Sequence, residues 1–298
     1  MSALTIPSGD NNFTSVAGFR ELAPYCEALI CDVWGVLHNG EVAFPEALAC
    51  LAEIRKGGAP VILVSNSPKP AAAMEGQLSA FGIFAGQHYD AVLTAGELAR
   101  SAALSRVGEL CYHLGPDRDS ATLEGLEPLL TDSIEEADYI LCTGLLNEEQ
   151  ETVEDYRDLF RAALSRPRSM ICANPDLIVH YGDREIPCAG LLAATYEALG
   201  GEVLYFGKPY PEIYRQSLAW MAKNLGRVPS PRRVIAIGDG LNTDIRGAQQ
   251  AGLASAFIAS GIHRHGEDDA LDTDEQRLRA LFELQDCWPD WVMGRMVW

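Results

Sequence analysis

The chain has 298 residues, of which 48% are hydrophobic and 22% are charged, as in an ordinary globular protein. Its 42 acidic residues against 23 basic ones give a formal net charge of −19. This balance argues against binding to a nucleic-acid backbone or to an anionic membrane surface. A small anionic substrate stays compatible with it, because a bound metal cation can invert the charge locally.

The chain carries no recognisable targeting or membrane segment. Its first residues contain neither a basic stretch nor an apolar core, so no signal peptide is expected. No apolar run approaches the roughly 20 residues of a transmembrane helix. The eight cysteines are scattered and never form a C-x-x-C pair, which favours reduced core residues over a zinc site or a disulfide framework. These features predict a cytoplasmic protein.

Short β-rich segments alternate with helical segments, which predicts a parallel sheet with crossover helices. Continuous apolar runs such as 59–65 are typical of strands covered on both faces. Three of the expected helices place a proline near the first turn, where its missing N–H costs nothing. In chain order, we expect a strand at 28–33, a helix at 45–57, a strand at 59–65, a helix at 70–81, a strand at 137–143, a helix at 148–165, a strand at 169–174, a helix at 189–200, a strand at 202–207, a helix at 211–225, a strand at 233–239, a helix at 242–252 and a strand at 254–259.

The middle of the chain is too long to be a simple connection. About 140 residues separate the strand that ends at Ser65 from the one that ends at Gly207, far more than one crossover needs. This interval has strands and helices of its own, so we expect an inserted α/β domain. The loops at 83–90 and 180–187 are the expected hinges by composition. The expected order is a sheet domain that begins at 1–86, an inserted domain at 87–183, and the rest of the sheet domain at 184–298.

Polar residues follow several of the expected strands where each strand ends. Asp32 ends the first, Ser65 with Asn66 the second, and Asp239 and Lys208 follow two later strands. Because ligands of parallel sheets bind outside the carboxyl ends of the strands, these side chains are expected to converge. They offer a nucleophile, a hydroxyl, an ammonium group and a second carboxylate.

Such a set suits phosphoryl transfer. A carboxylate can attack phosphorus, but two anions must first be brought together. Mg²⁺ held by one or two carboxylates reduces that repulsion, and Lys208 and Ser65 would stabilise developing negative charge. Each residue alone also has an ordinary explanation, since Asp239 and Asp244 could cap the following helix and Lys208 could be a surface charge.

Four segments, in the right order, resemble the motifs of the haloacid dehalogenase superfamily, in its class IIA branch with a NagD-type cap. A further segment, 171–190, is similar to the Asn-Pro-Asp loop of that cap. The resemblance covers about residues 25 to 260. The four motif segments are ICDVWGVLHNG (30–40), LVSNSPKP (63–70), GKPYPEIY (207–214) and IAIGDGLNTDIRGAQQAG (235–252).

The resemblance implies a doubly wound Rossmann-like core with an inserted α/β cap domain. It implies a Mg²⁺-dependent phosphatase that acts on a small phosphate monoester, such as a sugar phosphate or phosphorylated metabolite, through an aspartyl phosphate on Asp32. Caps of this type often contribute to dimers, so a homodimer is also expected. By the resemblance, the catalytic residues are Asp32, Ser65 and Lys208, the metal ligands are Asp32, the backbone carbonyl of Trp34, Asp239 and Asp244, and residues near the substrate are Asn66, Asn174 and Asp176.

The sequence departs from the family at one position. Phosphatases of the family carry a second Asp two residues after the nucleophile, which protonates the leaving group and later activates water, and this chain has Trp34 there. Indole cannot act as a general acid or base near neutral pH. His38 is close in sequence and is a candidate substitute and substrate contact, while the alternative is that it only lines the loop.

The departure leaves two alternatives to a phosphatase. One is a dehalogenase-like hydrolase, which forms an ester on Asp32 and needs no metal. The other is a non-catalytic or very slow protein that binds a phosphorylated ligand. Metal dependence separates the three hypotheses. A phosphatase needs the metal for turnover, a dehalogenase turns over without metal, and a binding protein shows no turnover.

Overall fold

The computed structural model describes residues 11–181, 184–261 and 274–298. The chain divides into two compact units, which are described separately below. The first unit comprises Met1–Ser65, Gln77–Val92 and Tyr214–Trp298, and the second comprises Asn66–Gly76 and Leu93–Ile213.

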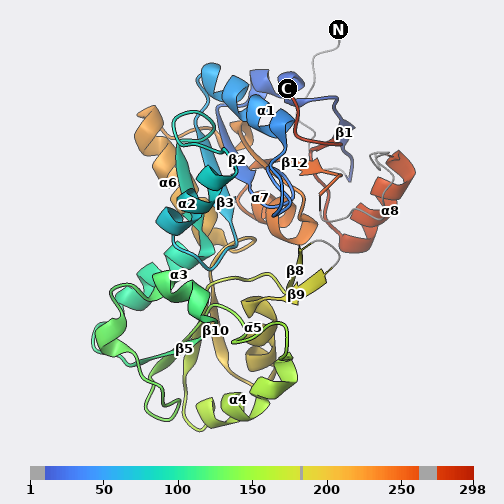
Figure 1. The fold of residues 1–298 in the computed structure, drawn as a ribbon. Helices are drawn as coiled ribbons and strands as arrows, with labels where there is room; N and C mark the ends of the chain where they lie inside the picture. The colour runs from blue at the N-terminus through green and yellow to red at the C-terminus, as the bar shows by residue number, and fades with distance from the viewer. Residues whose placement is uncertain (1–10, 182–183, 262–273) are drawn as a thin grey trace. The chain divides into compact units, whose positions relative to one another are not determined.

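The first unit is built on a seven-stranded sheet in which strands from the two ends of the chain lie side by side (Figure 1). The strand order is β1-β13-β12-β11-β2-β3-β4, and β2 pairs in parallel with both β11 and β3. Every position of β2, β3, β11 and β12 is buried, as their continuous apolar runs predict. The strands are β1 Thr14–Ser15, β2 Ala28–Asp32, β3 Val61–Ser65, β4 Ala91–Thr94, β11 Val234–Gly238, β12 Ala254–Ile258 and β13 Trp291–Met293.

The helices of this part of the chain begin largely where the prolines predict. Pro45 is the first residue of α1, and Pro211 is the first residue of α6. The helix expected at 242–252 instead begins as one turn of π-helix, Leu241–Ile245, before α7. The helices are α1 Pro45–Lys56, α7 Arg246–Gln250 and α8 Glu275–Gln285, together with α2 Ala71–Ala80 and α6 Pro211–Leu225, each of which has its first residues in the second unit.

The second unit has a four-stranded parallel sheet of its own, with the order β10-β7-β6-β5. Side chains of α4 and α5, including Phe160 and Tyr196, form a buried cluster with one set of strand residues, and Ala99 and Ala103 of α3 lie in a second cluster with other strand residues. A short antiparallel hairpin, β8–β9, completes the unit. The elements are α3 Ala95–Leu104, β5 Cys111–Leu114, β6 Tyr139–Cys142, α4 Arg157–Ala163, β7 Ser169–Cys172, β8 Ile178–Tyr181, β9 Arg184–Pro187, α5 Ala189–Ala198 and β10 Glu202–Tyr205.

Two sheets with crossover helices, one of them in the middle of the chain, confirm the predicted α/β class with an inserted α/β domain. The second unit runs to Ile213, past the expected limit at 183, because α5 packs on its sheet and β10 pairs with β7. The described residues of the expected hinge at 180–187 belong to the paired strands β8 and β9.

Several elements were not expected from the sequence, although α3 carried a signal. The Thr94 hydroxyl accepts a hydrogen bond from the Glu97 backbone N–H at 2.9 Å, which is the cap of this helix. A threonine followed three residues later by glutamate is a sequence pattern of helix starts. The short strands β1, β4, β5 and β13 lack the long apolar runs that identify the central strands.

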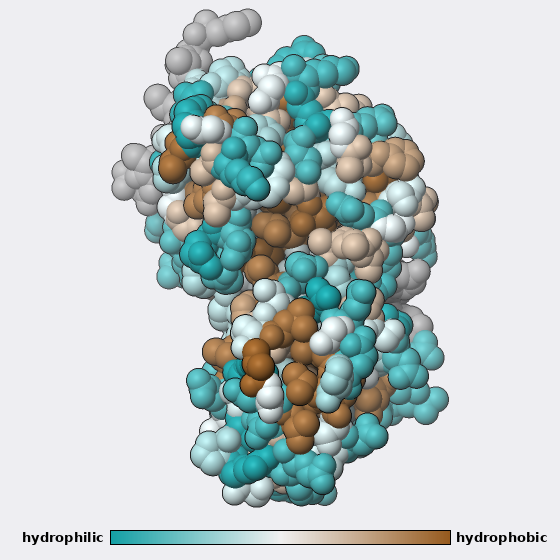
Figure 2. Space-filling view, turned by 90° about the vertical axis from the view of Figure 1, so that its left-hand side faces the viewer, coloured by the Kyte–Doolittle hydropathy of each residue, from teal (hydrophilic) through white to brown (hydrophobic). Residues whose placement is uncertain are grey.

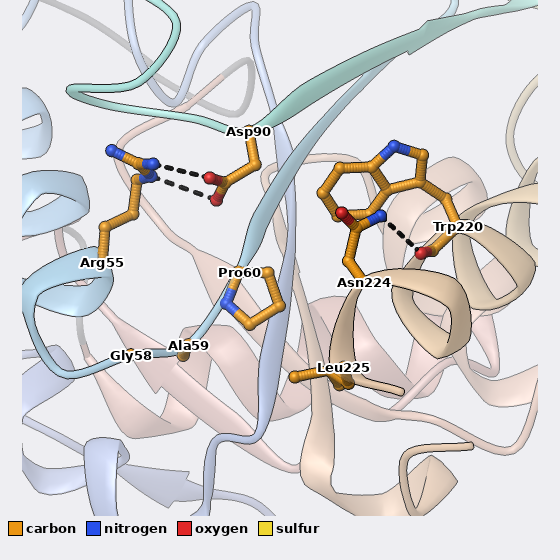
Figure 3. A pocket seen from close by; sticks show the side chains of 8 residues that line it. All are labelled: Arg55, Gly58, Ala59, Pro60, Asp90, Trp220, Asn224 and Leu225. Atoms are coloured by element: carbon orange, nitrogen blue, oxygen red, sulfur yellow. Dashed lines mark hydrogen bonds and ion pairs between the residues drawn. The ribbon is translucent and has the colours of Figure 1, made fainter. Parts of the chain in front are cut away.

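A pocket of about 350 Å³ opens near the start of β3 in the first unit (Figure 3). Arg55 Nη2 lies 2.5 Å from Asp90 Oδ1, and the Val61 N–H donates to Asp90 Oδ2 at 2.9 Å. Burial acts to raise the pKa of Asp90, but these bonds and the Arg55 charge together hold it below its ordinary value. The pocket lies at the amino end of β3, and is lined by Arg55, Gly58, Ala59, Pro60, Asp90, Trp220, Asn224 and Leu225.

Hydrophobic side chains also reach the surface, as the space-filling view shows (Figure 2). Scattered exposed apolar residues are normal in folded proteins.

Within the described part of the chain, none of the helices has the length and apolar character needed to cross a bilayer. The large exposed hydrophobic residues of the second unit include Leu104, Val107, Leu146, Leu177, Ile178 and Leu204.

Candidate active site

Three polar residues of the first unit lie at the carboxyl ends of neighbouring strands. Asp32 is the last residue of β2, Ser65 is the last residue of β3, and Asp239 directly follows β11. Because β2 lies between β11 and β3 and pairs in parallel with both, the three strands end at the same edge. All three side chains are buried. The fold thus produces the convergence that the strand ends predict.

A third acid, from the turn after β11, joins the carboxylates of Asp32 and Asp239. One carboxylate oxygen from each of Asp32, Asp239 and Asp244 lies within 4.8 Å of the others. Asp244 is held by its own turn, since its Oδ2 accepts hydrogen bonds from the Gly240 N–H at 3.3 Å and the Thr243 hydroxyl at 3.1 Å. The π-helical turn Leu241–Ile245 therefore positions this carboxylate.

The chemistry of this donor set fits Mg²⁺. Three buried carboxylates that approach so closely repel one another, and a cation between them offsets that repulsion. Carboxylate and carbonyl oxygens are the ligands that Mg²⁺ prefers in proteins, whereas soft transition metals favour sulfur and imidazole. The described residues near the trio offer oxygen donors of this kind, and the backbone carbonyl of Trp34 stays the fourth expected ligand.

Two glycines allow the chain to pack directly against Asp239. Gly35 has φ of +80°, and a Cβ there would lie 1.8 Å from Asp239 Oδ2. A Cβ on Gly261 would lie 2.0 Å from Asp239 Cβ. Sequence analysis did not single out either glycine for a role at the site. The signal for Gly35 was its place in the motif segment 30–40, three residues after Asp32, where a positive φ and a close approach both require glycine.

We expect Gly35→Ala to disrupt the acidic site. The substitution adds left-handed backbone strain, on the order of 1–2 kcal/mol, and drives a methyl group into the Asp239 carboxylate. Gly58→Ala is the matched control, because Gly58 has φ of +88° but no atom within 4 Å of its added Cβ. Thermal unfolding with and without Mg²⁺ should show a larger loss of stability, and a smaller stabilisation by Mg²⁺, for Gly35→Ala. Equal losses in the two variants would contradict a role for close packing on Asp239.

Backbone hydrogen bonds fix the path of the loop after β2. This loop carries Trp34 at the position where phosphatases of the family have their second aspartate. The Gly35 N–H donates to the His38 carbonyl at 2.8 Å, and the Leu37 N–H donates to the Val33 carbonyl at 2.9 Å. Trp34 packs edge-to-face on His38 with ring centroids 5.3 Å apart. A Cβ on Gly40 would lie only 2.4 Å from the Trp34 ring, so glycine lets the loop close over the indole.

His38 is built into this loop. Its side chain is buried, its Nδ1 accepts a hydrogen bond from the Gly40 N–H at 3.0 Å, and its ring stacks on Phe81 with centroids 4.4 Å apart. Burial lowers the pKa of His38 to about 4, so the imidazole is neutral at pH 7. These contacts favour the interpretation that His38 lines and closes the loop, and a contact with substrate stays a prediction.

In the second unit, Asn66 connects two loops that the motifs single out. Its Oδ1 accepts from the Lys208 N–H at 2.7 Å, and its Nδ2 donates to the Lys208 carbonyl at 3.0 Å. The same Nδ2 lies 2.8 Å from Asp176 Oδ1. Asn174 in turn accepts a hydrogen bond from the Asp176 N–H at 3.0 Å. Gly207 permits this close approach, because it has φ of +108° and its added Cβ would lie 2.6 Å from Asn66 Oδ1.

The structure thus brings the expected site residues together in two sets, one in each unit. Asn66 has a direct structural role that sequence alone did not assign, since it holds the backbone of Lys208 in place. The first set is Asp32, Trp34, His38, Ser65, Asp239 and Asp244, and the second is Asn66, Asn174, Asp176 and Lys208.

Comparisons with known proteins agree with this architecture. Residues 29–127 match the model of a haloacid dehalogenase-like hydrolase family, and residues 205–281 match a second, related model described as hydrolase-like. A haloacid dehalogenase-like hydrolase from Brucella suis superposes with a TM-score of 0.81 and 36% identity, covering 95% of this chain and 100% of that chain.

Two curated proteins are also similar. The ribonucleotide monophosphatase NagD of Escherichia coli is 26% identical over 82% of this chain and 91% of its own length. A dihydroxyacetone phosphatase of Corynebacterium glutamicum is 30% identical over 40% of this chain and 42% of its own length.

The fold and the strand-end site define an α/β hydrolase with an inserted domain. The chain belongs to the haloacid dehalogenase-like hydrolase family, in its class IIA branch.

Proposed function

We propose that the protein is a Mg²⁺-dependent phosphatase that hydrolyses a small phosphate monoester, a sugar phosphate or other phosphorylated metabolite. The observation that carries the proposal is the buried trio Asp32, Asp239 and Asp244, whose carboxylate oxygens lie within 4.8 Å of one another at the carboxyl edge of the sheet. The similar proteins named above include a ribonucleotide monophosphatase and a dihydroxyacetone phosphatase, which supports the phosphate ester as the class of substrate.

Each of the proposed catalytic residues has a separate role in the reaction. An Asp32 carboxylate oxygen attacks phosphorus, the ester P–O bond breaks and the alcohol leaves with the electron pair of that bond, taking its proton from solvent. Water then attacks the aspartyl phosphate, which releases inorganic phosphate and returns the Asp32 carboxylate. The Ser65 hydroxyl donates a hydrogen bond to a phosphoryl oxygen, and the Lys208 ammonium balances charge that develops in the transition state. When bound by Asp32, Asp239, Asp244 and the Trp34 carbonyl, Mg²⁺ supplies the positive charge that lets the two anions approach.

We also propose that the second unit is the cap domain of the enzyme. Its Asn66 holds both Asp176 and the backbone of Lys208, which ties the Asn-Pro-Asp loop to the loop that carries the catalytic lysine. Asn174 and Asp176 then serve substrate binding. A homodimer and a cytoplasmic location are further parts of this proposal; the family resemblance supports the first, and the eight free cysteines favour a reducing compartment.

Release of inorganic phosphate tests the proposal. A panel of small phosphate esters is incubated with the purified protein in Mg²⁺ and after treatment with a chelator, and we expect release only with Mg²⁺, restored when the ion is added back. Removal of the cation leaves the carboxylate trio uncompensated, so turnover should fall to background. Phosphate release that is unaffected by chelation would contradict the metal dependence.

The same experiment separates the two alternatives. A dehalogenase-like hydrolase would release halide from haloacids without metal, and three converging carboxylates have no use in that reaction. A binding protein would show heat stabilisation by phosphate esters with Mg²⁺ but no phosphate release. The acidic trio therefore favours the phosphatase over the metal-independent hydrolase.

A further inference from the structure

The turn that carries Asp244 is wider than a turn of α-helix. The Gly240 carbonyl accepts hydrogen bonds from the N–H groups of both Asp244, at 2.9 Å, and Ile245, at 3.1 Å, and the turn Leu241–Ile245 is π-helical. Turns of this kind are rare, usually occur singly and are frequent at functional sites. The contacts that hold this turn therefore determine where the Asp244 carboxylate lies.

Contacts inside the segment orient the carboxylate relative to its own turn. A Cβ on Gly238, the last residue of β11, would lie 2.1 Å from Asp244 Cγ, so glycine lets the carboxylate lie against the strand end. The Gly240 N–H and the Thr243 hydroxyl donate to Asp244 Oδ2. All of these groups belong to one short segment, so the position of the turn within the first unit depends on contacts from other segments.

Tyr214 of α6 reaches the turn from a distant part of the sequence. Its side chain is buried, and its Oη lies 3.3 Å from the carbonyl oxygens of both Thr243 and Asp244. Gly247 of α7 permits this approach, because a Cβ there would lie 2.3 Å from Tyr214 Oη. The Tyr214 hydroxyl thus donates to the backbone of the residue that carries the carboxylate and of the residue before it.

Arg246 connects the turn to α8. Its Nη2 donates to the Gln285 carbonyl at 2.7 Å and to Asn242 Oδ1 at 3.0 Å. The Asn242 Nδ2 donates in turn to Gln285 Oε1 at 2.9 Å. Gln285 is the last residue of α8, and a hydrogen bond from a charged donor is stronger than one between neutral groups. One guanidinium therefore joins a residue inside the turn and the residue directly after it to the C-terminal helix.

We propose that Tyr214 and Arg246 are positioning residues of the metal site. They hold the π-helical turn to α6 and to α8, so that a carboxylate oxygen of Asp244 stays within 4.8 Å of those of Asp32 and Asp239. Mg²⁺ demands near-ideal octahedral geometry, and a small displacement of one carboxylate weakens its binding. The inference rests on the proposed Mg²⁺-dependent function and goes beyond it, because neither residue is among the proposed ligands or catalytic residues.

Tyr214→Phe removes the hydroxyl and keeps the ring. We expect the Kd for Mg²⁺ to rise by about tenfold or more, the scale of effect when a residue that orients a metal ligand is lost. Thermal unfolding of the purified full chain over a series of Mg²⁺ concentrations gives this Kd without any substrate, because an ion that binds the folded protein raises its stability by an amount set by its concentration relative to Kd.

Tyr196→Phe is the matched control for this variant. Tyr196 is also buried, and its hydroxyl donates to the Arg168 carbonyl at 3.0 Å in the second unit. The control should lower the melting temperature measured without Mg²⁺ and leave the Kd for Mg²⁺ unchanged. A merely structural Tyr214 would give the same result as this control.

Arg246→Lys tests the connection to α8 and keeps the positive charge. An ammonium group lacks the planar fork of a guanidinium, so it does not reproduce the bonds to both Gln285 and Asn242, and the Kd for Mg²⁺ should again rise. Arg279→Lys is the matched control, because Arg279 lies in α8 and its Nε and Nη2 donate to Glu275 at 3.0 and 2.8 Å. In this control the Kd for Mg²⁺ should not change.

The outcomes separate this inference from the proposed function. If Mg²⁺ stabilises the natural protein and both variants keep its Kd, the inference is wrong and the proposed function stands. A change confined to one variant supports the role of that residue and overturns it for the other. If Mg²⁺ does not stabilise the natural protein at all, the metal dependence of the proposed function fails, and the inference fails with it.

Discussion

Asp32→Asn is expected to lower phosphate release by at least about 10³-fold, the scale seen when a catalytic nucleophile is removed. The amide of asparagine cannot attack phosphorus to form an acyl phosphate, and the substitution also removes one of the three carboxylates that face one another. The effect should appear in kcat, because the phosphoryl group loses its acceptor while the other residues that hold the substrate are unchanged.

The fold should survive this substitution. Asn is nearly isosteric with Asp, and the change reduces repulsion with Asp239 and Asp244, so the melting temperature should stay the same or rise. Asp286→Asn is the matched control, since Asp286 is exposed and its φ of 45° suits asparagine. Phosphate release and thermal unfolding, measured for both variants, check the prediction. Substantial turnover by Asp32→Asn would exclude Asp32 as the nucleophile.

Trp34→Asp is expected to raise kcat on alkyl phosphates by about 10²–10⁴-fold, the usual contribution of general acid–base catalysis. The position lies two residues after Asp32, and the indole there can neither protonate a leaving group nor activate water. His38 is not a ready replacement, because its Nδ1 is engaged by the Gly40 N–H and its ring is stacked on Phe81. The natural protein should therefore hydrolyse esters of acidic alcohols far better than esters of alkyl alcohols.

The loop should accept the smaller side chain. The bonds from Gly35 to His38 and from Leu37 to Val33 involve backbone atoms only, so the loop keeps its path without the indole. Steady-state kinetics on 4-nitrophenyl phosphate and glycerol phosphate measure the effect, and the gain should be largest for glycerol phosphate, whose leaving group most needs a proton. Trp34→Asn is the control of equal size without an acid. Equal rates for the Asp and Asn variants would show that another group already supplies the proton.

Much of the candidate site could be predicted because parallel strands impose a simple geometry. Asp32, Ser65 and Asp239 each end a continuous apolar run, and side-by-side parallel strands must bring such ends to one edge. The approach of Asp244 was expected only from the family resemblance, and the π-helical form of its turn was not expected. The limits of the inserted unit were harder to predict from the sequence, because they depend on the pairing of β10 with β7, and these two strands lie far apart in the chain.

The sequence by itself determined the α/β class, the inserted domain, the family and the acids at the strand ends, because apolar runs and strand-end residues are local patterns. Only the tertiary structure decided that His38 is stacked inside its loop and that Asn66 holds the Lys208 backbone. The sequence marked both residues as candidates for the site but could not show what their side chains contact. Burial and hydrogen-bond partners come from segments distant in the chain, and they exist only once the sheets have packed.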